Sequence, residues 1–447
     1  MALKITVIGT GYLGATHAAA MAELGFEVLG LDVVPEKIEM LSAGKVPMYE
    51  PGLEDLLAKH VAGIEGSSGR LRFTTSWEEI GEFGDVHFVC VNTPQKHGEY
   101  ACDMSYVDRA FASLAPQLKR PALVVGKSTV PVGSAARLAE LLVELAPVGV
   151  DAELAWNPEF LREGFAVQDT LHPDRIVVGV ESERAEKLLR EVYATPVGEG
   201  SPFVVMDFPT AELVKTSANS FLATKISFIN AMAEVCEAAD GDVVKLAEAI
   251  GYDERIGSKF LRAGIGFGGG CLPKDIRAFM ARAGELGADQ ALTFLREVDS
   301  INMRRRGHMV ELARDAVGGD SFLGKRVAVL GATFKPDSDD VRDSPALNVA
   351  GQIHLQGGQV TVYDPKGMEN ARRLFPTLAY ADSALDAVRG ADVVLHLTEW
   401  REFRELDAAA LGEVATSRII LDGRNALDGA RWREAGWTYR AMGRPRA

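Results

Sequence analysis

The sequence predicts an α/β protein with two Rossmann-like, doubly wound parallel-sheet domains joined by a long central helix. Short apolar runs alternate with helical patterns early in the chain, and the same alternation returns near its end. One long helical pattern without internal Gly or Pro lies between these regions. A chain of 447 residues is also too long for one ordinary hydrophobic core, which favours two or three domains.

The first α/β region contains six candidate strands separated by helical segments. They are Leu3–Ile8, Glu27–Leu31, Val86–Val91, Ala122–Val125, Glu153–Trp156 and Arg175–Val180. Strands that alternate with helices form βαβ units, which place the strands side by side in parallel. We therefore expect a parallel sheet in a domain over residues 1–205.

The middle of the chain is expected to be helical over residues 206–310. Pro209 suits the first turn of a helix that runs to about Ala239, and Gly241 follows its end. A shorter helix is expected to end near Ile250. The arginines at 304–306 are interpreted as a solvated helix face.

A second, smaller parallel α/β domain is expected over residues 311–447. Its candidate strands are Arg326–Leu330, Gln359–Tyr363, Asp392–Leu397 and Arg418–Leu421.

Composition limits the classes of function. The formal net charge of −15 argues against general nucleic-acid or membrane binding, so local positive groups must hold any anionic substrate. No apolar run approaches the roughly 20 residues of a membrane span, and the chain starts in a strand without a signal-peptide pattern. The cysteines form no CxxC pair, so we expect no metal site, no disulfide framework and a cytoplasmic protein; they are Cys90, Cys102, Cys236 and Cys271.

A glycine motif between the first strand and the next helix predicts a dinucleotide site. Gly9, Gly11 and Gly14 form a GxGxxG pattern, in which the glycines permit a tight turn, close approach of a pyrophosphate and close helix packing. The second strand ends at Asp32, whose carboxylate can bind the ribose hydroxyls and would repel a 2′-phosphate. The motif therefore predicts NAD rather than NADP.

Two further strands end in short polar side chains. Thr93 lies in the segment 91–94, and Ser128 and Thr129 lie in the segment 128–131. Ligands of such folds bind at the carboxyl ends of the strands, so these groups suit contacts to nicotinamide and ribose. Each segment alone also fits ordinary turn chemistry.

Three segments carry candidate chemistry. Residues 157–164 hold two carboxylates four residues apart, and Lys215 and Asn219 share one face of the long helix because they too are four apart. Cys271 lies in the glycine-rich segment Gly264–Asp275, where a sulfur can come close to a substrate. Cys90, in an apolar strand, and Cys236, in the long helix, are interpreted as packing residues.

The sequence resembles the UDP-glucose/GDP-mannose dehydrogenase family from Gly9 to about Leu427. The matching segments occur in order: 49–53, 91–94, 128–133, 157–164, 173–177, 211–228, 255–257, 266–275, 334–345 and 422–424. Some positions depart from the family pattern, which leaves pocket details open: Gly270 stands where many members have Ser, and Thr216, Ser217 and Ala231 also differ.

The resemblance implies a four-electron oxidation of a nucleotide sugar by NAD, with UDP-glucose converted to UDP-glucuronate through a thiohemiacetal and a thioester. The implied catalytic residues are Cys271, Lys215, Asp275, Asn219, Glu163 and Thr129. The implied substrate-binding residues are Glu159, Phe160, Leu161, Arg255, Phe260, Gly268, Lys335 and Arg424. The implied cofactor-binding residues are Gly9, Gly11, Tyr12, Leu13, Gly14, Asp32, Lys37, Thr93, Ser128, Thr129, Glu163 and Arg342.

The resemblance also implies a homodimer or a larger homo-oligomer, because the family's long central helix is its dimer core. Arg255 resembles a residue that reaches the substrate of a neighbouring subunit. GDP-mannose, or another nucleotide sugar, is the alternative substrate within the family. A two-electron hydroxy-acid dehydrogenase, which would not need Cys271, and an NAD-binding sensor without turnover are the alternatives outside it.

Overall fold

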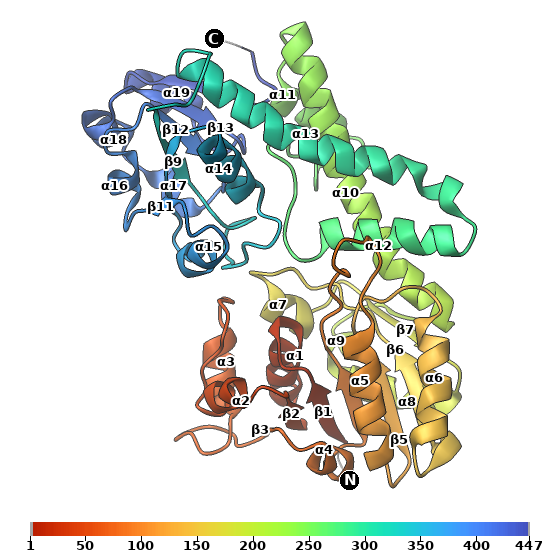
Figure 1. Cartoon of the computed structure of the whole chain (residues 1–447). Coiled ribbons are helices and arrows are strands. Elements are labelled where there is room, and N and C mark those ends of the chain that lie inside the picture. Colours follow the sequence, from red (N-terminus) through yellow and green to blue (C-terminus); the bar gives the residue numbers. More distant parts are fainter. Residues whose placement is uncertain (1–2, 446–447) are drawn as a thin grey trace. The chain divides into compact units, whose positions relative to one another are not determined.

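The computed structural model describes residues 3–445, and these form two compact units (Figure 1). The first unit contains the chain up to Ala218 together with Arg277–Leu286. The second unit contains Asn219–Ile276 and the chain from Gly287 onward. The prediction of two Rossmann-like α/β domains with a long helix between them in the sequence is confirmed.

An eight-stranded sheet in the order β3-β2-β1-β4-β5-β6-β7-β8 forms the centre of the first unit. Its neighbouring strands are parallel except for the antiparallel pair β6–β7, and the predicted runs omitted the edge strands β3 and β8. The strands are β1 (Lys4–Ile8), β2 (Glu27–Leu31), β3 (Leu71–Thr74), β4 (Val86–Val89), β5 (Ala122–Gly126), β6 (Ala152–Trp156), β7 (Ile176–Val180) and β8 (Phe203–Met206).

Helices cover both faces of this sheet, so each face has its own hydrophobic core. One core includes α1, α3 and α8, and the other includes α4, α5 and α6 (Figure 1). The helices are α1 (Tyr12–Glu23), α2 (Pro35–Ser42), α3 (Leu53–His60), α4 (Trp77–Phe83), α5 (Ser105–Leu114), η1 (Ala115–Gln117), α6 (Ser134–Leu145), η2 (Gly149–Asp151), α7 (Ala166–Leu171), α8 (Glu183–Val192) and α9 (Ala194–Gly198).

The second unit is built on a six-stranded sheet in the order β11-β10-β9-β12-β13-β14, whose neighbouring strands are all parallel. Its short edge strands β11 and β14 were not among the predicted runs. The strands are β9 (Arg326–Leu330), β10 (Gln359–Tyr363), β11 (Ala379–Tyr380), β12 (Val393–His396), β13 (Ile419–Asp422) and β14 (Thr438–Ala441).

One face of this sheet packs against α13, α14 and α15, and the other packs against α16 to α19. The helices are α11 (Val243–Gly251), η3 (Asp289–Leu292), α13 (Thr293–Ala316), α14 (Pro345–Leu355), α15 (Met368–Leu374), α16 (Ala384–Val388), α17 (Arg401–Glu405), α18 (Ala408–Val414) and α19 (Gly429–Glu434). Two further helices, α10 (Phe208–Ala239) and α12 (Leu272–Glu285), contribute residues to both units.

Local sequence explains where many helices begin. A side-chain oxygen at the N-cap accepts hydrogen bonds from backbone N–H groups of the first turn, which lack partners inside the helix. The capping residues are Ser76, Ser182, Asp242, Ser344, Ser383, Asp407 and Asp428.

The prediction that the arginines at 304–306 form a solvated face is wrong for Arg305 and Arg306. These two residues are 0% and 1% exposed, whereas half of the Arg304 side chain is exposed. Consecutive residues of a helix point about 100° apart, so three in a row cannot all face water on a helix that packs on one side. The buried guanidinium groups are paired, Arg305 with Glu237 at 3.1 Å and Arg306 with Asp343 at 2.7 Å.

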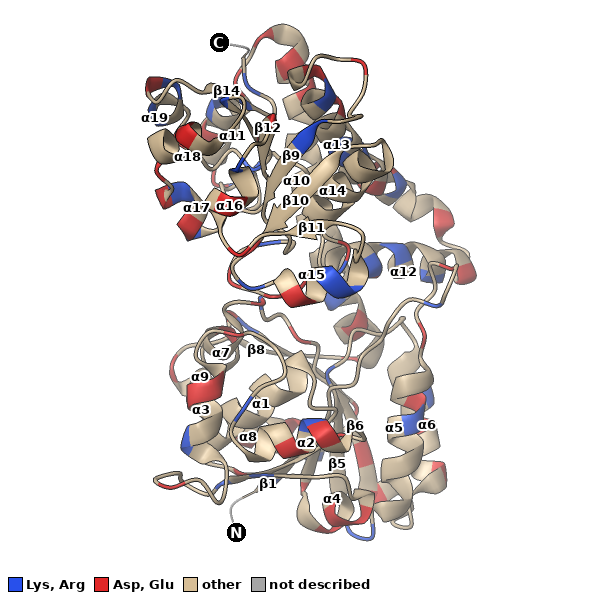
Figure 2. Ribbon diagram, turned by 60° about the vertical axis from the view of Figure 1, so that its left-hand side comes forward, with Lys and Arg blue, Asp and Glu red and all other residues tan. Residues whose placement is uncertain are grey.

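Charged residues of both signs are mixed on the helices in the view of Figure 2. Helix α14 contains no Lys, Arg, Asp or Glu and is drawn in tan. It lacks charged residues because it packs into the core of the second unit. Within residues 3–445, no helix combines the length and the apolar character that crossing a membrane requires.

Candidate active site

The glycine turn after β1 has the geometry that a dinucleotide requires. Gly9 has φ +86°, and a Cβ on Gly14 would lie 1.9 Å from the Gly9 carbonyl oxygen. Open space surrounds the position that a Cβ of Gly11 would take, and Gly11 caps α1 without a side-chain hydrogen bond. The first turn of α1 can therefore present its N–H groups to a pyrophosphate.

Asp32 lies at the end of β2, beside this turn. Its Oδ2 accepts hydrogen bonds from the Thr10 backbone N–H at 3.0 Å and from the Lys37 ammonium at 2.7 Å. The residue is 6% exposed, so these two donors fix the orientation of its carboxylate. Together with the glycine turn, this carboxylate fits the adenosine ribose of NAD, which presents neutral hydroxyls.

Side-chain hydroxyls connect the loops that follow β4 and β5. The Thr93 hydroxyl donates to the Thr129 carbonyl at 2.9 Å, and the Ser128 hydroxyl donates to the Val91 carbonyl at 2.6 Å. Both loops lie at the carboxyl edge of the sheet, where ligands of this fold bind. The structure thus brings Thr93, Ser128 and Thr129 together at the expected edge.

A buried lysine that the sequence interpretation missed holds Glu159. The Lys127 ammonium is 2.9 Å from the Glu159 carboxylate and 3.0 Å from Asn157 Oδ1, and its side chain is 4% exposed. The backbone N–H groups of Phe160 and Leu161 also donate to Glu159. The available signal was a lysine directly after an apolar strand, immediately before the polar segment 128–131.

This pairing keeps both groups charged. Burial alone would raise the pKa of the Glu159 carboxyl, but Lys127 and the two backbone donors hold that pKa below its usual value. Burial alone would lower the pKa of Lys127, but the Glu159 carboxylate and its neighbours raise it. The Glu159 carboxylate therefore helps to organise its own loop.

Glu50 fixes the end of the same loop. Its carboxylate accepts hydrogen bonds from the backbone N–H groups of Gly164 and Ala166, both at 2.7 Å, and from the Tyr12 hydroxyl. Gly164 has φ +81°, and Glu50 is 4% exposed. Glu163, which immediately precedes Gly164, is thereby held near the start of α1, and the segment 49–53 acquires a structural role.

Lys215 also faces this loop. Its ammonium lies 5.4 Å from the centre of the Phe160 ring, and the Arg175 guanidinium lies 4.0 Å from the same ring. The first unit thus gathers Lys215, Glu159 and the loop that carries Glu163.

In the second unit, Asn219 and Asp275 meet near the residue that follows the glycine-rich loop. Asn219 Nδ2 donates to Asp275 Oδ2 at 2.7 Å, and the Lys274 ammonium donates to Asp275 Oδ1 at 2.6 Å. Asp275 is 2% exposed and lies in the first turn of α12. Cys271 directly precedes that helix, so its position and that of Asp275 are linked through one helical turn.

The cysteines have different environments. Cys271 is exposed, whereas Cys90, Cys102 and Cys236 are buried. Burial raises the pKa of the Cys90 thiol to about 12, and burial also raises the pKa of Cys236. A thiol with a raised pKa is a poor nucleophile near neutral pH, which agrees with packing roles for Cys90 and Cys236.

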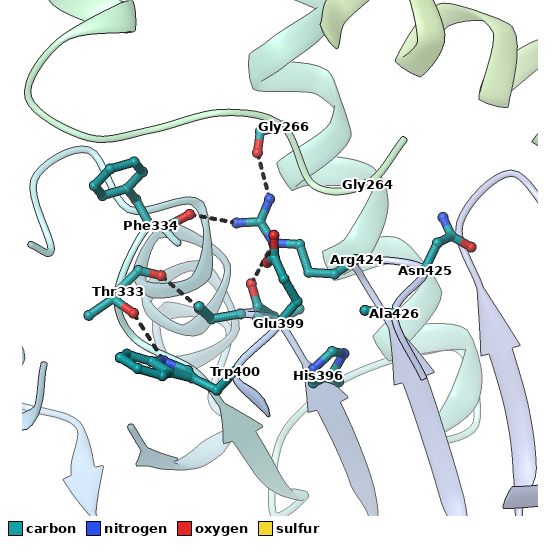
Figure 3. Close-up of polar contacts among 12 residues, drawn as sticks. Gly264, Gly266, Thr333, Phe334, His396, Glu399, Trp400, Arg424, Asn425 and Ala426 are labelled. Carbon is teal, nitrogen blue, oxygen red and sulfur yellow. Dashed lines mark hydrogen bonds and ion pairs between the residues drawn. The ribbon is translucent and has the colours of Figure 1, made fainter. Parts of the chain in front are cut away.

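Arg424 connects three loops of the second unit, as Figure 3 shows. Its guanidinium donates to the carbonyls of Leu397 at 2.8 Å, Gly266 at 2.8 Å and Phe334 at 3.1 Å. Glu399 lies 3.4 Å from its Nε, and the Arg424 side chain is 12% exposed. Arg424 therefore organises the carboxyl edge of this sheet, and it ties the loop before Lys335 to the glycine-rich loop before Cys271.

The other predicted residues of the second unit lie in varied surroundings. The Arg255 side chain is 89% exposed and pairs with Asp253, and Phe260 is 39% exposed with φ +64°. A Cβ on Gly268 would lie 2.3 Å from the Asp343 carbonyl oxygen. The Arg342 guanidinium lies against Gly270, where a Cβ would come within 2.3 Å of its Cζ.

Comparisons with known proteins cover the whole chain. Models of the UDP-glucose/GDP-mannose dehydrogenase family match residues 3–197 as the NAD binding domain, 209–304 as the central domain and 328–429 as the UDP binding domain. UDP-glucose 6-dehydrogenase of Rhizobium meliloti (strain 1021) is 41% identical over 445 residues, which are 99% of this chain and 100% of the relative.

Two solved structures share the fold along the full length. A UDP-glucose dehydrogenase from Pyrobaculum islandicum has a TM-score of 0.88 at 37% identity and covers 98% of both chains. A UDP-D-ManNAc dehydrogenase from Pyrococcus horikoshii has a TM-score of 0.86 at 28% identity and covers 100% of both chains.

Proposed function

Because the chain belongs to the UDP-glucose/GDP-mannose dehydrogenase family, we propose that it oxidises UDP-glucose to UDP-glucuronate. The observation that carries this proposal is the 41% identity to a UDP-glucose 6-dehydrogenase over essentially the whole of both chains. The first unit contains the NAD binding domain, and its glycine turn and Asp32 fit that cofactor. Each oxidation delivers one hydride to bound NAD.

The proposed overall reaction is a four-electron oxidation. One primary alcohol, two NAD⁺ and one water give one carboxylate, two NADH and three protons. The first oxidation produces an aldehyde, and the second produces the acid. A single site that performs both steps must hold the aldehyde between them, and a covalent bond to the protein is a direct way to do so.

In the first step, the C6 hydroxyl loses its proton as the hydride leaves. We assign the removal of this proton to Lys215 with Asp275, acting directly or through water. Lys215, Asn219 and Asp275 together form the group that handles the alcohol and aldehyde oxygen, where nearby donors stabilise the developing oxyanion. Asn219 and Asp275 already share a hydrogen bond, and both are buried. The negative charge of Asp275 is compensated by Lys274.

In the second step, the Cys271 thiolate adds to the aldehyde carbon, and the oxygen takes a proton to complete a thiohemiacetal. This adduct again carries a hydrogen on an alcohol-bearing carbon, so a second hydride can leave and a thioester remains. Water then attacks the thioester, the C–S bond breaks, and the Cys271 thiolate leaves. We assign the positioning of this water to Glu163, with Thr129 beside it, and the organisation of the loop to Glu159.

Local positive groups of the second unit are proposed to hold the diphosphate. Lys335, Arg424 and Arg255 are the candidates that the family resemblance selects, in a chain whose net charge is −15. Arg424 donates three hydrogen bonds to backbone carbonyls. A guanidinium has five N–H groups, so Arg424 can still donate to a ligand. Phosphate oxygens bound by such donors form charge-assisted hydrogen bonds.

We further propose that the chain assembles as a homodimer or larger homo-oligomer through the central region over residues 206–310. Phe221, Phe228 and Val235 on α10 are 66%, 48% and 57% exposed. Residues seven apart lie on the same face of a helix, so these side chains form one apolar stripe. A stripe of this kind is typical of a surface that a second helix covers. The exposed Arg255 is then available to a neighbouring subunit's substrate.

Product identification tests the proposed reaction. The protein is incubated with NAD and either UDP-glucose or GDP-mannose, NADH is counted by absorbance, and products are identified by mass spectrometry. We expect UDP-glucuronate and two NADH per UDP-glucose. Preferred turnover of GDP-mannose would assign the chain to the other branch of the family. One NADH per sugar, with aldehyde as the end product, would contradict the four-electron reaction.

A further inference from the structure

We propose that Asn302 and Arg306, on α13, are positioning residues that hold the glycine-rich loop Gly264–Gly270 so that Cys271 can capture the aldehyde. This inference rests on the proposed function for the role of Cys271. Neither residue was expected to take part in the site, and Arg306 was expected to face water. Both are buried, at 0% and 1% exposure.

The Asn302 side-chain amide bonds both the backbone N–H and the backbone carbonyl of Phe267 in the loop. Its Oδ1 accepts a hydrogen bond from the Phe267 N–H at 2.7 Å, and its Nδ2 donates to the Phe267 carbonyl at 3.1 Å. A Cβ on Gly266, which has φ +93°, would lie 2.2 Å from Asn302 Oδ1. The amide therefore approaches the loop backbone at a point where only glycine leaves room for it.

Arg306 links the same peptide to the segment that supports the rest of the loop. It donates to the Phe267 carbonyl at 2.9 Å and to the Asp343 carboxylate at 2.7 Å. Asp343 has φ +44°, an uncommon backbone conformation for a residue with a side chain. The neighbouring Arg342 carbonyl accepts the Gly269 N–H at 2.9 Å. Arg306 thus fixes both the loop and the segment on which it rests.

The loop needs such support because glycine imposes little conformational preference of its own. Five of the seven residues from Gly264 to Gly270 are glycine. Cys271 lies between this loop and α12, whose first turn begins with the Asp275 N–H bonded to the Cys271 carbonyl at 2.9 Å. Helix α12 constrains one side of Cys271. Asn302 and Arg306 hold the loop on the other side at Phe267, in addition to the contact of Arg424 with the Gly266 carbonyl.

Loss of either residue should therefore affect the fate of the aldehyde more than the first hydride transfer. A misplaced thiol captures the aldehyde slowly, and a shift of about 1 Å can cost about a hundredfold in rate. The aldehyde then has time to dissociate. This partition between acid and released aldehyde is a property of each folded molecule, so it does not depend on how much of a variant is folded.

The experiment compares Asn302→Leu and Arg306→Met with the wild-type protein in the presence of NAD and UDP-glucose. The readouts are NADH per UDP-glucose consumed and aldehyde trapped by an amine reagent. We expect both variants to fall from two NADH toward one and to release aldehyde at least roughly tenfold above wild type. Asn302→Asp keeps the acceptor for the Phe267 N–H, so its NADH yield per sugar should lie between those of the wild type and Asn302→Leu. This variant replaces Asn302→Leu in the experiment if Asn302→Leu does not fold.

Arg305→Met is the matched control, because Arg305 is equally buried on α13 but pairs with Glu237. Its Nε donates a long hydrogen bond of 3.5 Å to the Gly264 carbonyl, at the end of the loop farthest from Cys271. It should lower the melting temperature and keep two NADH per sugar. If Asn302→Leu and Arg306→Met also lower only the melting temperature, with two NADH and no trapped aldehyde, these residues are merely structural and the inference is wrong.

A second readout separates this inference from the proposed function. If wild-type protein makes no NADH from UDP-glucose, the proposed function fails, and the rate of Cys271 alkylation by iodoacetamide then tests the positioning role alone. An altered Cys271 rate in Asn302→Leu and an unaltered one in Arg305→Met would support it. Equal rates in all three proteins would overturn it.

Discussion

The Lys127 ammonium lies 2.9 Å from the Glu159 carboxylate, with 4% of the lysine side chain and 19% of the glutamate side chain exposed. Lys127 follows β5, and Glu159 belongs to the loop that also carries Glu163, so this ion pair joins two adjacent strand ends. Removing one partner should therefore both destabilise the first unit and disturb the loop that carries Glu159 and Glu163.

Lys127→Met is expected to lower the free energy of unfolding by about 3–5 kcal/mol, because it leaves a carboxylate buried without its counter-ion. The double variant Lys127→Met/Glu159→Leu should recover much of this loss, since a buried pair can often be replaced by apolar groups of similar volume. Urea unfolding of the two variants and the wild type measures both effects. Equal losses in the single and double variants would contradict the pairing.

The same pair predicts a defined pH dependence. The pKa of Glu159 is lowered, so its stabilising contribution is present above its usual pKa of 4.5 and is lost as pH falls through the lowered value. The pKa of Lys127 is raised, so its contribution is present below its usual 10.5 and is lost only as pH rises beyond the raised value. The stability difference between wild type and Lys127→Met should be flat near neutral pH and shrink on acidification. A difference that grows with acid would refute the assignment.

Asp32→Ser should relax the preference for NAD over NADP. The substitution removes the carboxylate that repels a 2′-phosphate. It also leaves the Lys37 ammonium, which in the wild-type protein lies 2.7 Å from Asp32 Oδ2, without that partner. The measurement is kcat/KM with each cofactor. Asp32→Ser/Lys37→Ala should accept NADP less well than the single variant, and wild-type protein that already prefers NADP would rule out the role of Asp32.

Cys271→Ala should block the route to the acid more severely than the first hydride transfer. Residual turnover should give at most one NADH per sugar, with the aldehyde or its hydrate as product, because no thiohemiacetal can form. Cys90→Ala and Cys236→Ala remove buried thiols and should change stability modestly while leaving two NADH per sugar. The acid is measured by mass spectrometry. If Cys271→Ala still forms it at the full rate, the covalent mechanism is wrong.

Phe228→Asp should dissociate the proposed dimer, because it places a charge in the middle of the apolar stripe on α10. Activity should fall with assembly if Arg255 completes a neighbour's site. Light scattering over a range of concentrations gives the mass, and the same samples are assayed. The exposed Leu374, on α15, provides the control substitution Leu374→Asp. A monomeric wild-type protein with full activity would contradict both the dimer and the role of Arg255.

Expectations that depended on local pattern were close to the structure. The predicted helix 209–239 corresponds to α10 at Phe208–Ala239, and all ten predicted apolar runs coincide with strands. The strands that were missed, such as β3 and β11, are short edge strands, where exposure weakens the apolar pattern. The antiparallel pairing of β6 with β7 was also not expected, because strand direction depends on how the connecting chain returns.

The sequence by itself determined the α/β class and the dinucleotide turn at Gly9. It also selected Asp32 as the candidate ribose-binding carboxylate and Cys271 as the candidate nucleophile. Each of these depends on residues that are neighbours in the chain, where backbone conformation and periodicity leave a direct record. Only the tertiary structure decided that Lys127 is buried against Glu159, that Glu50 holds Gly164 from 114 residues away, and that Arg306 lies in the interior. A charged side chain stays buried only where distant partners compensate it, and no local pattern specifies which distant residues will meet.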